Sequence, residues 1–431
     1  MLKTLRNAWA IKEIRNKILF TIFILLVFRV GSVIPVPFIN PTALKEGSAD
    51  NQFFSYLSVL TGGGLQYGAI FALSVTPYIN SSIIVQLLTV VFKRLQEWSK
   101  EGEEGQKKLA QLIRFVTVIL AVIQGIAYFI YLKNGHNSKG VPFLNVEGTF
   151  ATIFAGFVLV TTFAAGSTLV MWLGEQIDAK GIGNGISMIL FAGIIARAPE
   201  AAISMINMAL QGQYIAVAAV VVIFIAVIMF VVWMTNAERR IGVQYAKRVV
   251  GNKMYGGQNT HIPIKVNMSG VMPIIFASSI LMLPTMILSF MGTTPSETTL
   301  QKFLGLFAAD GAFYAVVYFF LIIGFAYFYA TIQFNPQEMS NNLRKNGGAI
   351  PGIRPGQPTT DFISKILSRI TLLGALFLSV VAILPIVVGN VGKINIALGG
   401  TSVLIMVGVA LDTVRSLESQ MMMRHYKGFL D

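Results

Sequence analysis

The sequence contains no cysteine and little charge. Among its 431 residues, 12% are Asp, Glu, Lys or Arg and 55% are hydrophobic. Charged residues make up about 25% of an ordinary soluble domain, so the composition excludes a soluble globular protein and indicates a polytopic membrane protein. The absence of cysteine excludes disulfides, thiol chemistry and cysteine-ligated metal sites.

Ionisable and catalytic groups are also missing from the hydrophobic segments. All 19 acidic residues, and His136, His261 and His425, fall in expected loops or at segment ends. Coupling of transport to ions needs such groups near the membrane midplane, so the sequence argues against ion coupling. The motifs H-E-x-x-H, G-x-S-x-G and the Walker sequence are absent. We therefore expect no enzyme activity and no cofactor, and any work would draw its energy from a partner.

The hydrophobic stretches predict an all-α membrane protein with ten crossings. The expected spans are residues 18–34, 76–92, 115–132, 150–174, 182–196, 214–234, 268–288, 313–334, 370–388 and 397–411. The first span follows a basic segment, as a signal peptide would. Pro35 and Pro37 follow it without a small-residue cleavage site, so we expect a retained first helix.

The longest uncharged run predicts a change of direction inside the membrane. Residues 51–92 contain no Asp, Glu, Lys, Arg or His, and a continuous helix of that length would span roughly 63 Å against a hydrocarbon core of about 30 Å. If the run crosses once, 26 of the 33 Lys and Arg residues lie on the side of the amino terminus. The positive-inside rule makes that side cytoplasmic. We therefore infer one crossing and one half-inserted segment.

The half-inserted segment covers about residues 53–73 and contains a run of three glycines. Irregular backbone at membrane depth must be surrounded by protein or water, so it predicts a cavity. An interfacial helix on the outer leaflet is the alternative. Arg29, near the outer end of the first span, is the one charge inside an expected span, and we expect its side chain to reach the interface.

Two long loops are expected on the cytoplasmic side, at about residues 235–267 and 335–369. In the first, Ile241, Val243 and Tyr245 alternate with small or polar residues before a turn-prone GNK sequence, which predicts a β-hairpin. The second is dense in Pro and Gly, which would hold a basic tip in place. Both loops could be solvated segments whose charge only enforces topology. Their length and turn chemistry favour surfaces that dock RNA phosphates or an acidic protein.

Seven motifs, in order along nearly the whole chain, match a known family. They are VFRVGSVIPVP (27–37), TPYINSSIIVQLL (76–88), MWLGEQIDAKGIGNGIS (171–187), ERRIGVQYAKR (238–248), HIPIKVNMSGVMPIIFASS (261–279), GAIPGIRPG (348–356) and LGGTSVLI (398–405). The sequence resembles the SecY family, the channel-forming subunits of the bacterial protein translocase. The resemblance implies ten transmembrane helices in two pseudo-symmetric, inverted five-helix halves, residues 1–200 and 201–431.

The resemblance also implies which residues form the centre of the channel. It implies a re-entrant plug that includes Phe53, Phe54, Leu57, Leu60, Gly62, Gly63, Gly64 and Leu65. It implies a pore ring formed by Val75, Ile79, Ile186, Leu190, Ile275 and Ile405. Such a ring offers a passing backbone no hydrogen bonds, and a narrow apolar throat resists wetting.

Two further surfaces follow from the resemblance. A lateral gate between the second and seventh helices would involve Asn80, Ser81, Gln124, Ser278 and Ser279, although ordinary interhelical hydrogen bonding explains these polar residues equally well. A surface for SecA or the ribosome would include Arg354, Arg344, Lys345, Arg239, Arg240, Lys247 and Arg248.

The resemblance implies the SecA ATPase, the ribosome, SecE, SecG, membrane lipids and signal-sequence-bearing polypeptides as partners. It implies a place in the bacterial cytoplasmic membrane, with both termini in the cytoplasm. Two other classes remain open from the residues alone. A secondary transporter would take up an organic solute without SecA or a ribosome, and an insertase without a pore would show no ion leak after deletion of residues 54–66.

Overall fold

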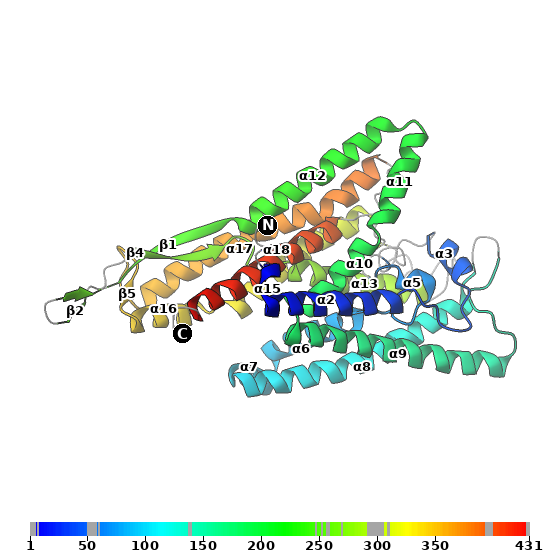
Figure 1. Ribbon diagram of the computed structural model, residues 1–431, viewed down its shortest axis with the longest axis horizontal. Helices are drawn as coiled ribbons and strands as arrows, with labels where there is room; N and C mark the ends of the chain where they lie inside the picture. The colour runs from blue at the N-terminus through cyan, green and yellow to red at the C-terminus, as the bar shows by residue number, and fades with distance from the viewer. Residues whose placement is uncertain are drawn as a thin grey trace.

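The computed structural model is an elongated bundle of helices with a small sheet at one end (Figure 1). It describes residues 6, 8–49, 58, 61–136, 140–245, 248–250, 253–255, 259–268, 270–290, 306–307, 311–392 and 400–427. The sheet carries β1, and we call its end of the molecule the strand end. At the opposite end lie the short helices α3 (Pro41–Ala49) and α5 (Gly64–Tyr67).

Each of the ten expected spans coincides with a helix. These are α2 (Lys12–Gly31), α6 (Thr76–Val91), α8 (Glu103–Asn134), α9 (Thr149–Lys180), α10 (Gly185–Ala196), α12 (Tyr214–Asn236), α13 (Met272–Phe290), α15 (Ala312–Gln333), α17 (Gln357–Gly392) and α18 (Gly400–Lys427). Within the described ranges, six helical segments are both long and apolar enough to cross a membrane. The prediction of an all-α polytopic membrane protein is confirmed.

Three more helices were not expected, because they are polar or lie beside a span. They are α7 (Lys93–Lys100), α11 (Ala198–Leu210) and α16 (Pro336–Lys345). The start of α16 shows how local sequence sets a boundary. The Asn335 side chain accepts the backbone N–H groups of Gln337 (3.1 Å) and Glu338 (3.4 Å), and Pro336 occupies the first turn, where its missing N–H costs nothing.

Three apolar clusters form the interior of the helical bundle. The first joins α12, α13, α15, α17 and α18, and all its buried members lie between residues 231 and 411. The buried members of the second lie between residues 36 and 163. The third joins α2, α9 and α10 to Ile405 and Val409 of α18, so it connects residues from the two ends of the chain. We call it the central cluster.

Helices α9 and α10 meet at two glycines. A methyl group added to Gly185 would overlap the backbone carbonyl of Gly174, and one added to Gly174 would overlap the Ile186 side chain. The close approach of the two backbones therefore requires glycine at position 185, whereas at position 174 the end of the Ile186 side chain would have to move. It fixes the place of α10, which carries two of the expected pore-ring residues.

We expect Gly185→Ala to lower the free energy of unfolding by about 1–3 kcal/mol, because overpacking forces the two helices apart. Thermal unfolding of the purified protein in detergent measures the change. Gly324→Ala is the matched control, since nothing lies within 4 Å of a methyl group at that position in α15 and alanine favours helix. An equal loss in both variants would contradict the close-packing explanation.

The predicted β-hairpin is confirmed at the strand end, where further strands add to it. β1 (Glu238–Tyr245) pairs antiparallel with β4 (Asn259–Lys265), and β2 (Arg248–Val250) pairs with β3 (Lys253–Tyr255). The second long loop contributes β5 (Gly348–Ala349), which pairs with the other edge of β1. The strand order is β4-β1-β5. The two loops therefore form one folded unit, with a buried core that includes Ile241, Val243, Leu343 and Ile350.

Candidate functional site

A folded-in segment, residues 61–75, lies beside α2, α8, α9 and α10. We call it the plug segment. Gly62 (φ 66°) and Gly63 (φ 90°) adopt left-handed conformations that favour glycine, and they reverse the chain before α5. A methyl group on Gly62 would lie 2.9 Å from the Cα atom of Gly193 in α10. The glycine run expected to interrupt the uncharged stretch therefore forms a turn packed against a helix.

The plug segment is bound through its backbone. The N–H of Val36 donates to the carbonyl of Gly68 (2.9 Å), and the N–H of Ile70 donates to the carbonyl of Ile34 (3.0 Å). Near the end of the segment, Ser74 is a non-glycine residue with φ 48°, and Val75 follows it as the last residue before α6. Of the other expected plug residues, Phe53, Phe54, Leu57 and Leu60 lie outside the described residues.

Side chains from three helices also donate to carbonyls of the plug segment. The pairs are Arg29 Nη1 to Gly62 (2.6 Å), Tyr128 Oη to Leu65 (2.6 Å) and Ser167 Oγ to Ser74 (3.1 Å). The half-buried Arg29 guanidinium therefore binds a backbone carbonyl of the plug segment. The expectation that the side chain reaches the membrane interface stays a prediction.

The six residues expected to form the pore ring all lie in the central cluster. Val75 is 1% exposed, Leu190 3% and Ile405 2%, while Ile79, Ile186 and Ile275 are partly buried against them. They come from the start of α6 and from α10, α13 and α18. Phe71 of the plug segment belongs to the same cluster. The arrangement is a packed apolar cluster in contact with a folded-in segment.

The polar residues expected at the lateral gate make different contacts. α13 packs against both α6 and α8. The Ser81 hydroxyl lies 2.6 Å from Thr117 Oγ1 and donates to the Ile113 carbonyl (3.1 Å), so it ties α6 to α8. Ser278 donates to Ile275 within its own helix (2.9 Å). Ordinary helix packing therefore accounts for these two hydroxyls.

The other gate candidates carry no recorded bond across the seam. Gln124 and Ser279 are half-buried. Asn80 Oδ1 is buried and has no hydrogen-bond partner within the described part of the chain. An unpaired buried amide oxygen is costly, which distinguishes Asn80 from the serines.

The basic tip of the second loop is exposed but held. The Thr359 hydroxyl donates to the Arg354 carbonyl (2.9 Å), and the Ser340 hydroxyl donates to the Gly356 carbonyl (3.0 Å). Ile350 anchors the start of the tip in the core beneath the sheet. The Arg354 side chain itself is exposed. The prediction that turns hold this tip is confirmed.

The other basic residues of the two loops differ in exposure and in pairing. Arg344, Lys345 and Arg239 are exposed, whereas Arg240 Nε is paired with Glu238 Oε1 at 2.7 Å. Arg248 begins β2, and Lys247 lies outside the described residues. Among the residues that the structure describes, no group of three or more His, Cys, Asp or Glu could hold a metal ion.

The fold is that of a polytopic α-helical membrane protein in which a folded-in segment packs against a central apolar cluster. A family model described as SecY matches residues 69–414. The chain belongs to the SecY family. The protein translocase subunit SecY of Streptomyces scabiei is 42% identical over 438 residues, covering 100% of both chains. That of Thermotoga maritima is 42% identical over 443 residues, covering 100% of this chain and 98% of its own.

Solved structures agree on the fold. One described as a protein conducting channel superposes with a TM-score of 0.63 at 17% identity, covering 94% of this chain and 92% of its own. Sec61 from a canine ribosome-channel complex gives a TM-score of 0.61 at 17% identity, with the same coverage. At these identities the likeness concerns the fold alone.

Proposed function

We propose that the chain is a passive protein-conducting channel, through which unfolded polypeptides cross the bacterial cytoplasmic membrane or enter it sideways. The observation that carries the proposal is the convergence of six aliphatic side chains from four elements in the central cluster. A ring of this chemistry forms no hydrogen bonds with a passing backbone and resists wetting when empty. The plug segment would close one side of the ring.

The distribution of the core supports two halves, residues 1–200 and 201–431. The first and second apolar clusters draw their buried members from opposite sides of residue 200. The central cluster alone among these three combines α2, α9 and α10 with α18. Because the six ring side chains are aliphatic, they can separate around a polypeptide without breaking hydrogen bonds of their own. The halves are also joined by a hydrogen bond from Lys17 Nζ to Gln420 Oε1 (3.2 Å), which their parting would have to break. Sideways release would pass between α6 and α13, with Asn80 at the seam.

The driving force would come from the SecA ATPase or from ribosomal elongation, with SecE and SecG as neighbouring subunits. The Arg354 tip is exposed, and Arg344, Lys345 and Arg239 are exposed in the same two loops. These side chains offer positive charge for docking an acidic protein or RNA phosphates. Loop charge supports a cytoplasmic location for both termini and for the strand end.

A crosslinking experiment tests the proposal, because the chain has no natural cysteine. A single cysteine at Ile405 should crosslink to a secretory polypeptide stalled during translocation, since Ile405 lies in the central cluster. A single cysteine at Val222, which is exposed on α12, is the matched control and should react poorly. Efficient crosslinking at Val222 with none at Ile405 would overturn the central pore.

A further inference from the structure

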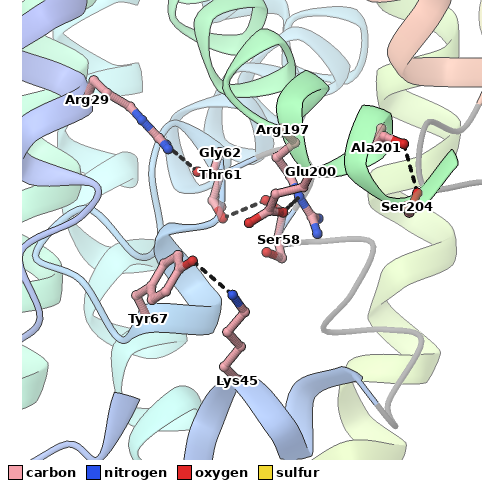
Figure 2. A network of polar contacts seen from close by, with 10 residues as sticks. All are labelled: Arg29, Lys45, Ser58, Thr61, Gly62, Tyr67, Arg197, Glu200, Ala201 and Ser204. Carbon is pink, nitrogen blue, oxygen red and sulfur yellow. Dashed lines mark hydrogen bonds and ion pairs between the residues drawn. The ribbon is translucent and has the colours of Figure 1, made fainter. Parts of the chain in front are cut away.

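Arg29 makes a contact that the proposed function does not require. It lies in α2, and its half-buried guanidinium donates from Nη1 to the carbonyl of Gly62 at 2.6 Å. Figure 2 shows the side chain extending from α2 toward the turn that carries Thr61 and Gly62. Charged groups at membrane depth are costly, and those that pair with backbone carbonyls often mark a functional pathway.

Gly62 is held from two directions. Arg29 binds its carbonyl from α2, while Gly193 of α10 lies so close that a methyl group on Gly62 would be 2.9 Å from the Gly193 Cα atom. The turn is also closed internally, because the N–H of Gly63 donates to the carbonyl of Ser58 (2.8 Å). Displacement of Gly62 therefore has to break the Arg29 bond and move the Ser58 backbone with it.

Two longer polar contacts lie near the Gly62 turn. Lys45 Nζ donates to Tyr67 Oη at 3.3 Å in an exposed position. Arg197 pairs with Glu200 at 3.4 Å, three residues away in the sequence (Figure 2). Exposed contacts of this kind contribute little, because water competes for both partners. A partly desolvated hydrogen bond with a charged donor is stronger. Among the side-chain bonds to carbonyls of the plug segment given above, Arg29 supplies the one with a charged donor.

We propose that Arg29 is a positioning residue that latches the plug segment in the closed channel. The inference rests on the proposed function, since a latch has meaning only if the plug moves. The guanidinium holds the Gly62 carbonyl while the channel is closed, and it must release the carbonyl whenever a polypeptide displaces the plug. Arg29 thereby sets how often the plug segment leaves its place without a substrate.

A buried reporter allows the latch to be tested directly. Ser58 is 0% exposed and its hydroxyl has no hydrogen-bond partner among the described residues, so Ser58→Cys removes no recorded side-chain bond. We expect a membrane-impermeant maleimide to label this cysteine slowly in the otherwise unchanged protein. Adding Arg29→Ala should raise the labelling rate by roughly tenfold to a hundredfold, the loss expected for a charge-assisted hydrogen bond.

Two further variants sharpen the test. Arg29→Lys keeps the charge but loses the planar fork, so its labelling rate should fall between those of the other two proteins. Ser32→Ala is the matched control on the same stretch, because the Ser32 hydroxyl donates to Phe28 at 2.9 Å and not to the plug segment. It should leave the rate unchanged.

The possible outcomes test the Arg29 latch separately from the protein-conducting function. Unchanged labelling in Arg29→Ala, with thermal unfolding like that of the parent, overturns the latch. If Arg29→Ala fails to fold, Arg29→Gln replaces it, and unchanged labelling there overturns the latch equally. SecA-driven translocation is measured on the same preparations. Faster labelling together with translocation supports both proposals, while faster labelling in a protein that never translocates supports the latch and removes the protein-conducting function.

Discussion

Arg354→Glu is expected to reduce SecA-driven translocation about tenfold or more, because a reversed charge at a docking contact replaces attraction with repulsion. Arg354 is exposed, and the hydrogen bonds from Thr359 and Ser340 hold its loop in one shape. The substitution therefore changes charge without removing a packed group. Translocation of a secretory precursor into proteoliposomes measures the effect.

The control for this prediction is Lys107→Glu. Lys107 is exposed on α8, where it pairs with Glu103 of the same helix at 3.0 Å, and reversal there should leave translocation near the parental rate. Arg354→Lys, which keeps the charge, should retain much of the activity. Parental translocation by Arg354→Glu would remove the docking assignment.

Ile405→Ser is expected to raise the resting ion conductance of the channel. The 2% exposed Ile405 side chain lies in the central cluster, and a hydroxyl there would lower the cost of wetting the constriction. The loss of apolar burial is about 2 kcal/mol, which corresponds to roughly a thirtyfold rise in conductance. Planar-bilayer recordings of the purified protein, without substrate, measure it.

Val407→Ser is the control that distinguishes wetting of the central cluster from a general loss of packing. Val407 lies on the same helix but packs in the first apolar cluster, with α12, α13, α15 and α17. We expect it to lose comparable stability without gaining conductance. Equal conductance in both variants would show that the leak comes from loosened packing, and no leak in either, nor after deletion of residues 54–66, would favour an insertase without a pore.

The family motifs supplied the six residues expected to form the pore ring, and a local rule agrees for two pairs of them. Val75 and Ile79, like Ile186 and Leu190, are four apart and share a helix face, and family motifs identified the partners on α13 and α18. The structure places all six in one cluster. Their role as a pore ring stays a prediction.

Long-range polar partners could not be predicted in the same way. Arg29 and Gly62 are 33 residues apart, and nothing in the side-chain pattern marks a backbone carbonyl as an acceptor. Ser81 illustrates the same gap, since its hydroxyl binds α8 instead of facing α13. Hydrophobic periodicity reports which face of a helix is buried, but it does not report which neighbour covers that face.

The pairing of the two long loops was missed for a related reason. β5 has two residues, Gly348 and Ala349, too few for any alternation to appear. Its position depends on β1, more than 100 residues earlier. It also depends on close packing, because a methyl group on Gly348 would lie 3.0 Å from the Tyr245 side chain and 3.2 Å from that of Val243. The turns at residues 350–356 could be predicted from their Pro and Gly content, whereas the two-residue strand before them could not.

The joined sheet has a mechanical consequence. β1 continues almost directly from α12, β4 leads toward α13, and β5 lies between α16 and α17 (Figure 1). If the Arg354 tip is the docking surface proposed above, a force applied there would be shared among these helices through the joined sheet. Because α13 also packs against α6 and α8, we would expect docking to strain the contact between α6 and α13, and so to couple docking to sideways opening.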